Sequence, residues 1–240
     1  MYYFVQKLNA GETEEELKQL YKNYEYFKVF YDSLFSDFVG AYKISKGKDE
    51  NGEPIFEEKY GLKAYSPIAY GFNVNFCDDF DNETNFARQK GHFGNDITVK
   101  KGTPFIAVES GVVSKIEKKD YVTRVEIKTF DEKRTYVYAN CNGKDSFKKF
   151  VKKGATVRGG QILGFVGANN CCKKGGAKML KTPYIHFGMR ISIKNSKQPA
   201  QPTEEVYVDV YNILKFLEHH KSAVEKTNSG YKEKYMFKDK

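Results

Sequence analysis

The 240-residue sequence has no tryptophan and few cysteines, and those cysteines are poorly spaced for binding a metal. Chelating cysteine pairs in zinc sites are usually about two to four residues apart. Here the cysteines are isolated or directly adjacent: Cys77, Cys141, Cys171 and Cys172. Four cysteines in a chain of this length do not make a disulfide scaffold either, so we interpret them as structural or incidental.

A long uninterrupted hydrophobic run is also absent. A membrane-spanning helix needs roughly 20 apolar residues in succession, and no segment approaches that length. The first residues, MYYFVQKLNAGETEEE, lack the basic start and apolar centre of a secretory signal. We therefore expect no transmembrane segment and no export signal in this chain. Either the protein stays inside the cell or an upstream segment is missing.

Acidic residues are outnumbered, with 31 Asp and Glu against 40 Lys and Arg, which gives a formal net charge of +9. This excess suits an anionic partner such as a cell-wall polymer, a nucleic acid or an acidic lipid. The basic residues are spread through loops and interleaved with glutamate, which favours a solvated surface. Because only net charge supports nucleic-acid binding, we expect no nucleic-acid partner.

The first 59 residues are predicted to form a helical extension followed by a linker. Thr13 and Glu16 are spaced as a capping box, and apolar residues recur at three- and four-residue intervals from there to Phe38. This apolar stripe packs on the main domain or on a partner protein. Residues 45–59 are polar, with glycine and proline, and are predicted to be a linker or a hairpin.

From residue 60 to about residue 208, short runs rich in valine, isoleucine, phenylalanine and tyrosine alternate with glycine turns. This pattern predicts a mainly β fold, an antiparallel β sandwich or barrel. Residues 210–220, VYNILKFLEHH, predict a short C-terminal helix. The last segment, residues 221–240, is polar and slightly basic, and we expect a flexible tail.

The segment GHFGND places a histidine, His92, four residues before an aspartate, Asp96, directly ahead of a β-like run. Imidazole and carboxylate are both good zinc ligands, but a surface turn explains the same pattern equally well. A second histidine, His186, lies in the strand-like segment PYIHFGMRI. Strand alternation puts Tyr184, His186 and Gly188 on one face. Taken alone, His186 is also compatible with a solvent-facing strand position.

Three blocks of this sequence resemble the lysostaphin/LytM-type zinc peptidases in order and spacing. The blocks are GHFGNDITVKKGTPFIAVESGVV (residues 91–113), VKKGATVRGGQILGFVG (151–167) and PYIHFGMRI (183–191). The resemblance covers about residues 62–216 and leaves the N-terminal helix outside. It implies a small antiparallel β sandwich with one zinc ion (Zn2+) in a groove. The implied ligands are His92, Asp96 and His186, with a fourth position open, as a catalytic zinc site requires.

The same resemblance implies two further active-site histidines, and this sequence departs from the family at both positions. Asn140 stands where the family has the histidine of a Y-x-H segment, and Tyr184 replaces the first histidine of H-x-H. Both side chains can donate a hydrogen bond to an oxyanion, but neither is a good general base near neutral pH. General acid–base help is worth roughly 10²–10⁴-fold, so we expect reduced activity. The alternative is a catalytically inactive pseudo-peptidase.

By this resemblance, residues 60–220 form a peptidase domain that acts on peptidoglycan peptides. Cell-wall peptide or polymer would be the partner, with the N-terminal helix available to a partner protein. Such enzymes work mostly in the cell envelope or outside the cell, although this chain shows no export signal. Lysine-rich loops, including Lys148 and Lys152, could flank the groove and hold an anionic polymer, or could be solvated.

Overall fold

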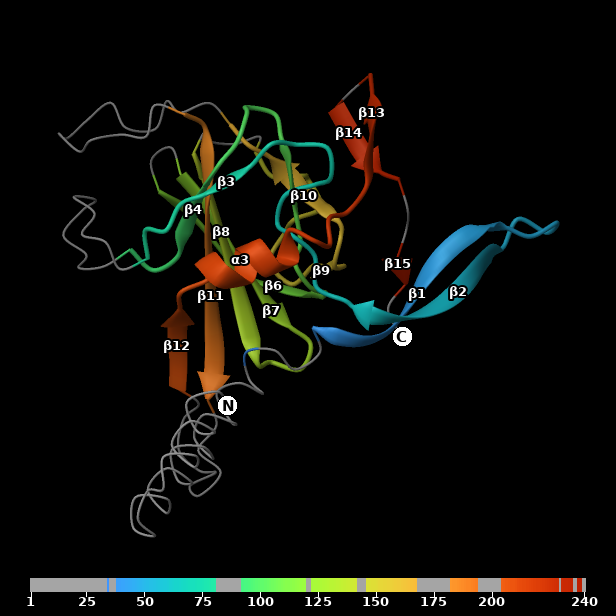
Figure 1. Ribbon diagram of the computed structural model, residues 1–240, viewed down its shortest axis with the longest axis horizontal. Helices are drawn as coiled ribbons and strands as arrows, with labels where there is room; N and C mark the ends of the chain where they lie inside the picture. The colour runs from blue at the N-terminus through green and yellow to red at the C-terminus, as the bar shows by residue number, and fades with distance from the viewer. Residues whose placement is uncertain are drawn as a thin grey trace, which may run out of the picture.

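The computed structural model describes residues 34, 38–80, 92–119, 122–141, 146–167, 182–193, 204–228, 230–234 and 237–238. Nearly all of the helix expected over residues 13–38 lies outside these ranges. Strands dominate the described residues, and every strand pair is antiparallel (Figure 1). The expected mainly β fold is therefore confirmed. No helix among the described residues has both the length and the apolar character needed to span a membrane.

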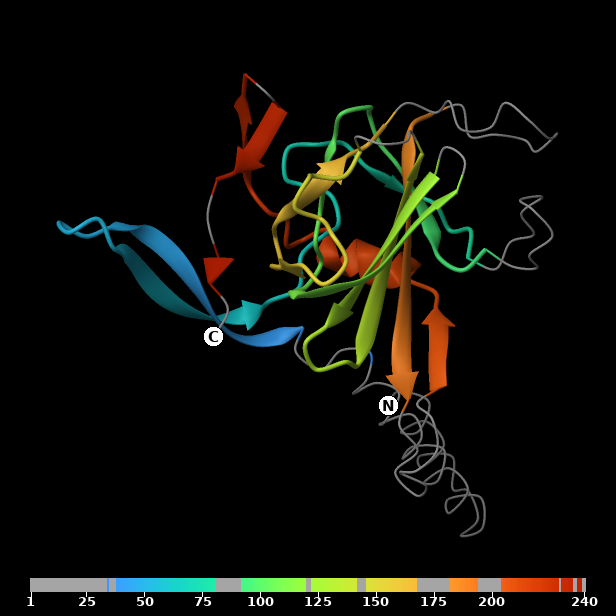
Figure 2. The same ribbon diagram turned by 180° about the vertical axis from the view of Figure 1, so that it is seen from behind.

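One large sheet carries most of the fold (Figure 2). Its strands lie in the order β3 (Asn75–Phe76), β4 (Asn95–Thr98), β11 (Tyr184–Ile193), β8 (Arg134–Cys141), β7 (Val122–Thr129), β6 (Gly111–Lys119) and β9 (Thr156–Val157). Strand β12 (Glu204–Val208) pairs with the C-terminal half of β11, from Met189 to Ile193. The long strand β11 lies between β4 and β8, so residues distant in sequence meet along it.

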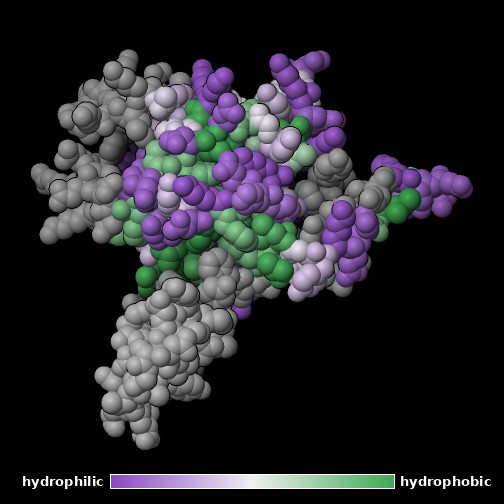
Figure 3. Space-filling view, in the orientation of Figure 1, coloured by the Kyte–Doolittle hydropathy of each residue, from purple (hydrophilic) through white to green (hydrophobic). Residues whose placement is uncertain are grey.

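The inner face of this sheet is covered by a second layer. That layer contains the two-stranded sheet of β5 (Pro104–Ile106) and β10 (Ile162–Phe165), and helix α3 (Tyr211–Leu217), whose buried side chains join the main core. Helix α3 lies within the segment expected to be helical, residues 210–220. Polar side chains cover its outward side, with apolar surface beside them (Figure 3). Alternation along β11 sends Ile185, Phe187 and Met189 into the core.

A charged cluster is buried in this core. The Arg134 guanidinium donates to both carboxylate oxygens of Glu109, at 2.7 and 3.2 Å, and the Tyr136 hydroxyl donates to the same carboxylate. Arg134 also lies over the ring of Phe38, 5.4 Å from its centre. Burial raises the pKa of Glu109 despite the attraction of Arg134. The pair therefore requires its hydrogen bonds to offset the cost of desolvation.

Residues 39–62, partly expected as a linker, form a hairpin. Strands β1 (Val39–Lys48) and β2 (Pro54–Leu62) pair along their length and project from the body of the protein (Figure 1). The turn is held by the Asp49 carboxylate, which accepts from the backbone N–H groups of Asn51 and Glu53. Of the two alternatives left open by the sequence of residues 45–59, the structure has the hairpin.

The C-terminal segment differs from the flexible tail expected for residues 221–240. Strands β13 (Val224–Thr227) and β14 (Gly230–Glu233) pair with each other, and β15 (Phe237–Lys238) pairs with β1. The Glu233 carboxylate accepts from the backbone N–H of Ile162, which ties this hairpin to β10. A polar composition misled the prediction, because backbone pairing and two apolar side chains, Val224 and Tyr231, which pack against a buried cluster, are enough to hold this hairpin.

Candidate metal centre

Two neighbouring strands bring the predicted ligands together. Asp96 lies on β4 and His186 on β11, and the two residues are direct partners in the antiparallel register. Directly opposed residues project their side chains to the same face of a sheet. Since Ile97 and Ile185 point into the core, Asp96 and His186 both face outward. His92 reaches the same place from the loop just before β4.

The three side chains converge on one point. His186 Nδ1 is 3.0 Å from His92 Nε2 and 3.1 Å from Asp96 Oδ1, and His92 Nε2 is 3.4 Å from Asp96 Oδ1. Tetrahedral zinc with bonds of about 2.0–2.1 Å separates its ligand atoms by roughly 3.3 Å. This donor set, two imidazole nitrogens and one carboxylate oxygen, therefore fits a single zinc ion and leaves one position open.

A residue that the sequence analysis had not assigned to the site, Asp79, orients two of these ligands. Its backbone carbonyl lies 2.7 Å from His92 Nδ1, and its carboxylate accepts from the backbone N–H of Asp96 at 3.0 Å. A proton on Nδ1 directed at that carbonyl leaves the Nε2 lone pair free for a metal. Asp79 lies in the acidic segment CDDFDNE, residues 77–83, and no local pattern there predicts these contacts, because they depend on the tertiary fold.

Gly94 is required where the loop passes over the site. Its backbone has φ of +146°, and a Cβ there would lie 2.7 Å from the imidazole of His186 and 2.6 Å from the carbonyl of Phe187. Any larger residue would push the loop away from β11. Gly94 thus allows His92 to approach His186.

The cluster is electrostatically coupled. Burial disfavours the charged form of His92, but the hydrogen bonds with Asp96 and with the Asp79 carbonyl outweigh it and raise the His92 pKa. Burial likewise disfavours ionised Asp96, yet the two histidines hold its pKa below the usual value. A proton shared in this cluster must leave when a metal binds, so metal affinity should fall as pH is lowered.

Cys77 lies next to the cluster but is not suited to be a ligand. Burial, followed by the charges of Asp79 and Asp96, raises the pKa of its thiol to about 11. A metal ligand must be a thiolate, which this environment disfavours. The structure therefore gives no reason to add Cys77 to the three ligands.

The two positions that replace the implied histidines have different surroundings. Tyr184 is on the same face of β11 as His186, two residues before it. Asn140 is fully buried and pairs with the inward-facing Ile185, while Ala139 is the β8 residue opposite His186. The Asn140 amide donates to the Phe165 carbonyl and accepts from the Gly167 N–H. Its hydrogen-bonding capacity is thus directed at the backbone next to β10 and not at the three ligands.

Comparison with protein families decides where this site belongs. The model of peptidase family M23 matches residues 90–202, a range that includes His92, Asp96 and His186. Residues 90–202 belong to peptidase family M23. The family expected from the three sequence blocks is thereby confirmed. A search of curated proteins found no match to the chain.

Solved structures that match this chain include two peptidases and Csd3 from Helicobacter pylori. The catalytic domain of the antimicrobial peptidase lysostaphin from Staphylococcus simulans is 20% identical, over 59% of this chain and 92% of that domain, with a TM-score of 0.41. A zinc-containing peptidase from Vibrio cholerae is 20% identical over 62% of this chain and 46% of its own, with a TM-score of 0.39. Csd3 from Helicobacter pylori is 22% identical, over 74% and 46%, with a TM-score of 0.38.

The role of Asp79 can be tested by substitution. Asp79→Ala should weaken zinc binding by roughly 10–100-fold, the usual effect of losing an outer partner of a ligand. Asp79→Asn keeps an oxygen that can accept from the Asp96 N–H, so it should recover most of that affinity. Zinc titration against a competing chelator measures both, with the exposed neighbour variant Asp78→Ala as control. Both variants keep the backbone carbonyl that faces His92, so the test addresses the carboxylate contact with Asp96. Equal affinities for Asp79→Ala and the parent would rule out a role for that carboxylate.

Proposed function

We propose that this M23 domain is a zinc-dependent endopeptidase that cleaves peptides of peptidoglycan. The observation that carries the proposal is the convergence of His92, Asp96 and His186, with ligand atoms 3.0–3.4 Å apart on one sheet face. The family membership of residues 90–202 supports a peptidase reaction. The wall peptide as substrate follows from the resemblance of the three sequence blocks to the lysostaphin/LytM-type enzymes.

In this proposal, each ligand residue has a defined part. His92 and His186 would each present one ring nitrogen to zinc, and Asp96 would present Oδ1. Asp79 keeps His92 in the matching tautomer. A bound zinc ion supplies Lewis-acid chemistry: it polarises a carbonyl oxygen and makes water a better nucleophile near neutral pH.

Tyr184 is the candidate for stabilising the oxyanion that forms as the amide is attacked. It shares a strand face with His186, and its hydroxyl can donate a hydrogen bond to developing negative charge. A phenol titrates near pH ~10, so the same hydroxyl is a poor general base at neutral pH. We therefore propose an activity reduced by about 10²–10⁴-fold relative to a site with a histidine base.

One observation favours the alternative, a catalytically inactive domain that binds wall peptide or a partner protein. The amide of Asn140 is occupied by the backbone groups of Phe165 and Gly167, so this residue replaces neither the base nor the oxyanion donor of a histidine. If Tyr184 alone cannot support the chemistry, the metal would serve only to order the groove and to hold a ligand.

Hydrolysis of purified peptidoglycan by the zinc-loaded protein separates the two proposals. Newly released amino groups should appear with zinc and should disappear with chelator or in Asp96→Ala. Tyr184→Phe should lower the rate, because it removes only the hydroxyl, whereas Tyr184→His should raise it by at least about 10-fold. Zinc bound one-to-one with no release by any of these proteins would instead identify the inactive binder.

A further inference from the structure

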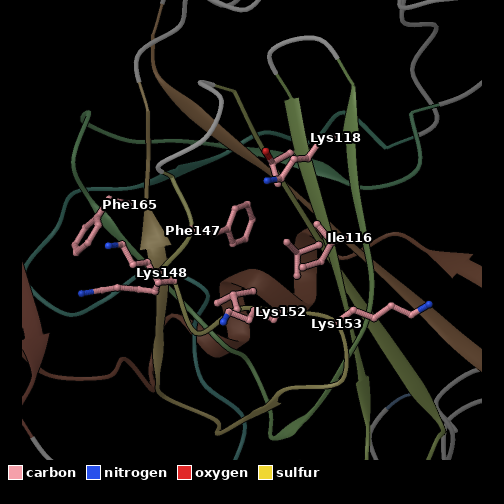
Figure 4. A pocket seen from close by; sticks show the side chains of 11 residues that line it. Ile116, Lys118, Phe147, Lys148, Lys152, Lys153 and Phe165 are labelled. Carbon is pink, nitrogen blue, oxygen red and sulfur yellow. The ribbon is translucent and has the colours of Figure 1, made fainter.

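A pocket of about 590 Å³ opens between the end of the main sheet and the segment that leads into β10. Its lining residues come from β6, β7, the 147–153 segment and β10: Ile116, Lys118, Thr123, Val125, Phe147, Lys148, Lys149, Val151, Lys152, Lys153 and Phe165. In Figure 4 the ring of Phe147 and the side chain of Ile116 stand in the middle of this lining, with the labelled lysines around them. The volume is within the usual range of small-molecule sites.

This pocket lies on the face of the main sheet opposite to the metal centre. Its sheet residues share one face because they pair directly across β6 and β7, Ile116 with Val125 and Lys118 with Thr123. Thr123 pairs in turn with Asn140, and Asn140 with Ile185, so the same face continues to β11. His186 follows Ile185 and points to the other side. A ligand in the pocket would therefore not compete for the metal.

The charge of the lining has one sign. Five lysines contribute to it and no acidic residue does. Among the described residues, no carboxylate forms an ion pair with any of these five. The ammonium of Lys148 lies 4.9 Å from the centre of the Phe165 ring, which leaves its charge at the edge of the pocket. Such an arrangement attracts an anion.

The interior of the pocket is apolar. Val125 and Val151 are buried, and the half-buried Ile116, Phe147 and Phe165 complete a floor without hydrogen-bond donors from their side chains. A free inorganic anion or a polyol phosphate would contact the lysines but would leave the apolar side chains of the floor exposed to water. An occupant with a hydrocarbon part as well as a negative charge satisfies both the floor and the rim.

We infer that this pocket binds a single-chain anionic lipid, with its hydrocarbon chain against Ile116, Phe147 and Val151 and its phosphate among the lysines. This assignment is independent of the peptidase proposal, because it uses the opposite sheet face and none of the metal ligands. Under this inference, the five lysines of the pocket use part of the protein's excess positive charge to bind the lipid phosphate.

Dodecyl phosphate, kept below its micellar concentration, is the probe, and isothermal titration calorimetry on the full chain is the measurement. We expect one saturable site. Inorganic phosphate and the uncharged dodecyl maltoside should each bind at least about 10-fold more weakly, because each supplies only half of the required chemistry. The double variant Lys118→Gln/Lys152→Gln should lose at least about 10-fold in affinity.

The matched control is Lys59→Gln/Lys101→Gln, which changes the net charge equally at exposed positions outside the pocket. It should bind like the parent, and Ile116→Thr should weaken binding without any change of charge. All variants should keep the parent's thermal unfolding midpoint. Unchanged affinity in the Lys118/Lys152 variant would overturn the inference. Equally tight binding of a short inorganic polyphosphate would also overturn it, since that would show a general polyanion surface.

Discussion

His186→Ala is expected to abolish zinc binding and, with it, any peptidase activity. Loss of an outer partner alone costs roughly 10–100-fold in metal affinity, and this substitution removes a ligand atom. The remaining pair, His92 Nε2 and Asp96 Oδ1, would leave two positions without a protein donor. Zinc content after dialysis, and titration against a competing chelator, measure the loss. We expect a decrease of more than about 100-fold.

The chain provides a matched control for this experiment. His219 is exposed in the turn after α3, and His219→Ala removes the same side chain away from the metal centre. This variant should bind zinc like the parent. Zinc content unchanged in His186→Ala would show that the assigned ligands are wrong. A variant that no longer folds would be recognised by its circular dichroism and would be replaced by His186→Gln.

The largest effect on stability is expected from Arg134→Met. The guanidinium is almost fully buried and is bound to both oxygens of Glu109, so its loss leaves a carboxylate with the Tyr136 hydroxyl alone. Removing one partner of a buried ion pair usually costs about 3–5 kcal/mol. Urea denaturation at pH 7 should show a decrease of that size in the free energy of unfolding.

The pH dependence of this loss follows from Glu109. Burial already raises the pKa of its carboxyl in the folded protein, and without Arg134 the pKa should rise further. A carboxyl whose pKa is higher in the folded than in the unfolded protein stabilises the fold at pH values below the unfolded pKa. This stabilisation is lost as the pH rises through the folded pKa. The loss in free energy of unfolding caused by Arg134→Met, relative to the parent, should therefore be smaller in acid than at pH 7. Adding Glu109→Gln should recover part of the loss at pH 7, and full additivity of the two substitutions would contradict the coupling.

Local sequence patterns were sufficient for the β fold and for the strand face of His186. Alternation in PYIHFGMRI put His186 on the face opposite to Ile185 and Phe187, and the structure has this arrangement. Period-two alternation follows from backbone geometry alone, so it can be read without knowing the neighbours. The expected short helix near residue 211 is also present, because its apolar residues recur on one side.

Prediction failed where long-range pairing decides the structure. The segment 221–240 looked like a tail, but β13 and β14 form a hairpin that a hydrogen bond from Ile162 to Glu233 ties to β10. The sequence also did not predict the burial of Arg134, because its partner Glu109 lies 25 positions away in the sequence. Asn140 was expected near the reacting groups, yet the register with Ile185 turns its side chain inward.

By itself, the sequence determined the face of β11 on which His186 lies and the M23 family of residues 90–202. These features depend on spacing within short segments. The tertiary structure alone decided that Asp79 supports His92 and Asp96, that Asn140 is bound to backbone, and that five lysines surround an apolar pocket. Each of these contacts joins segments whose approach is set by strand register and sheet packing, and no local pattern encodes that register.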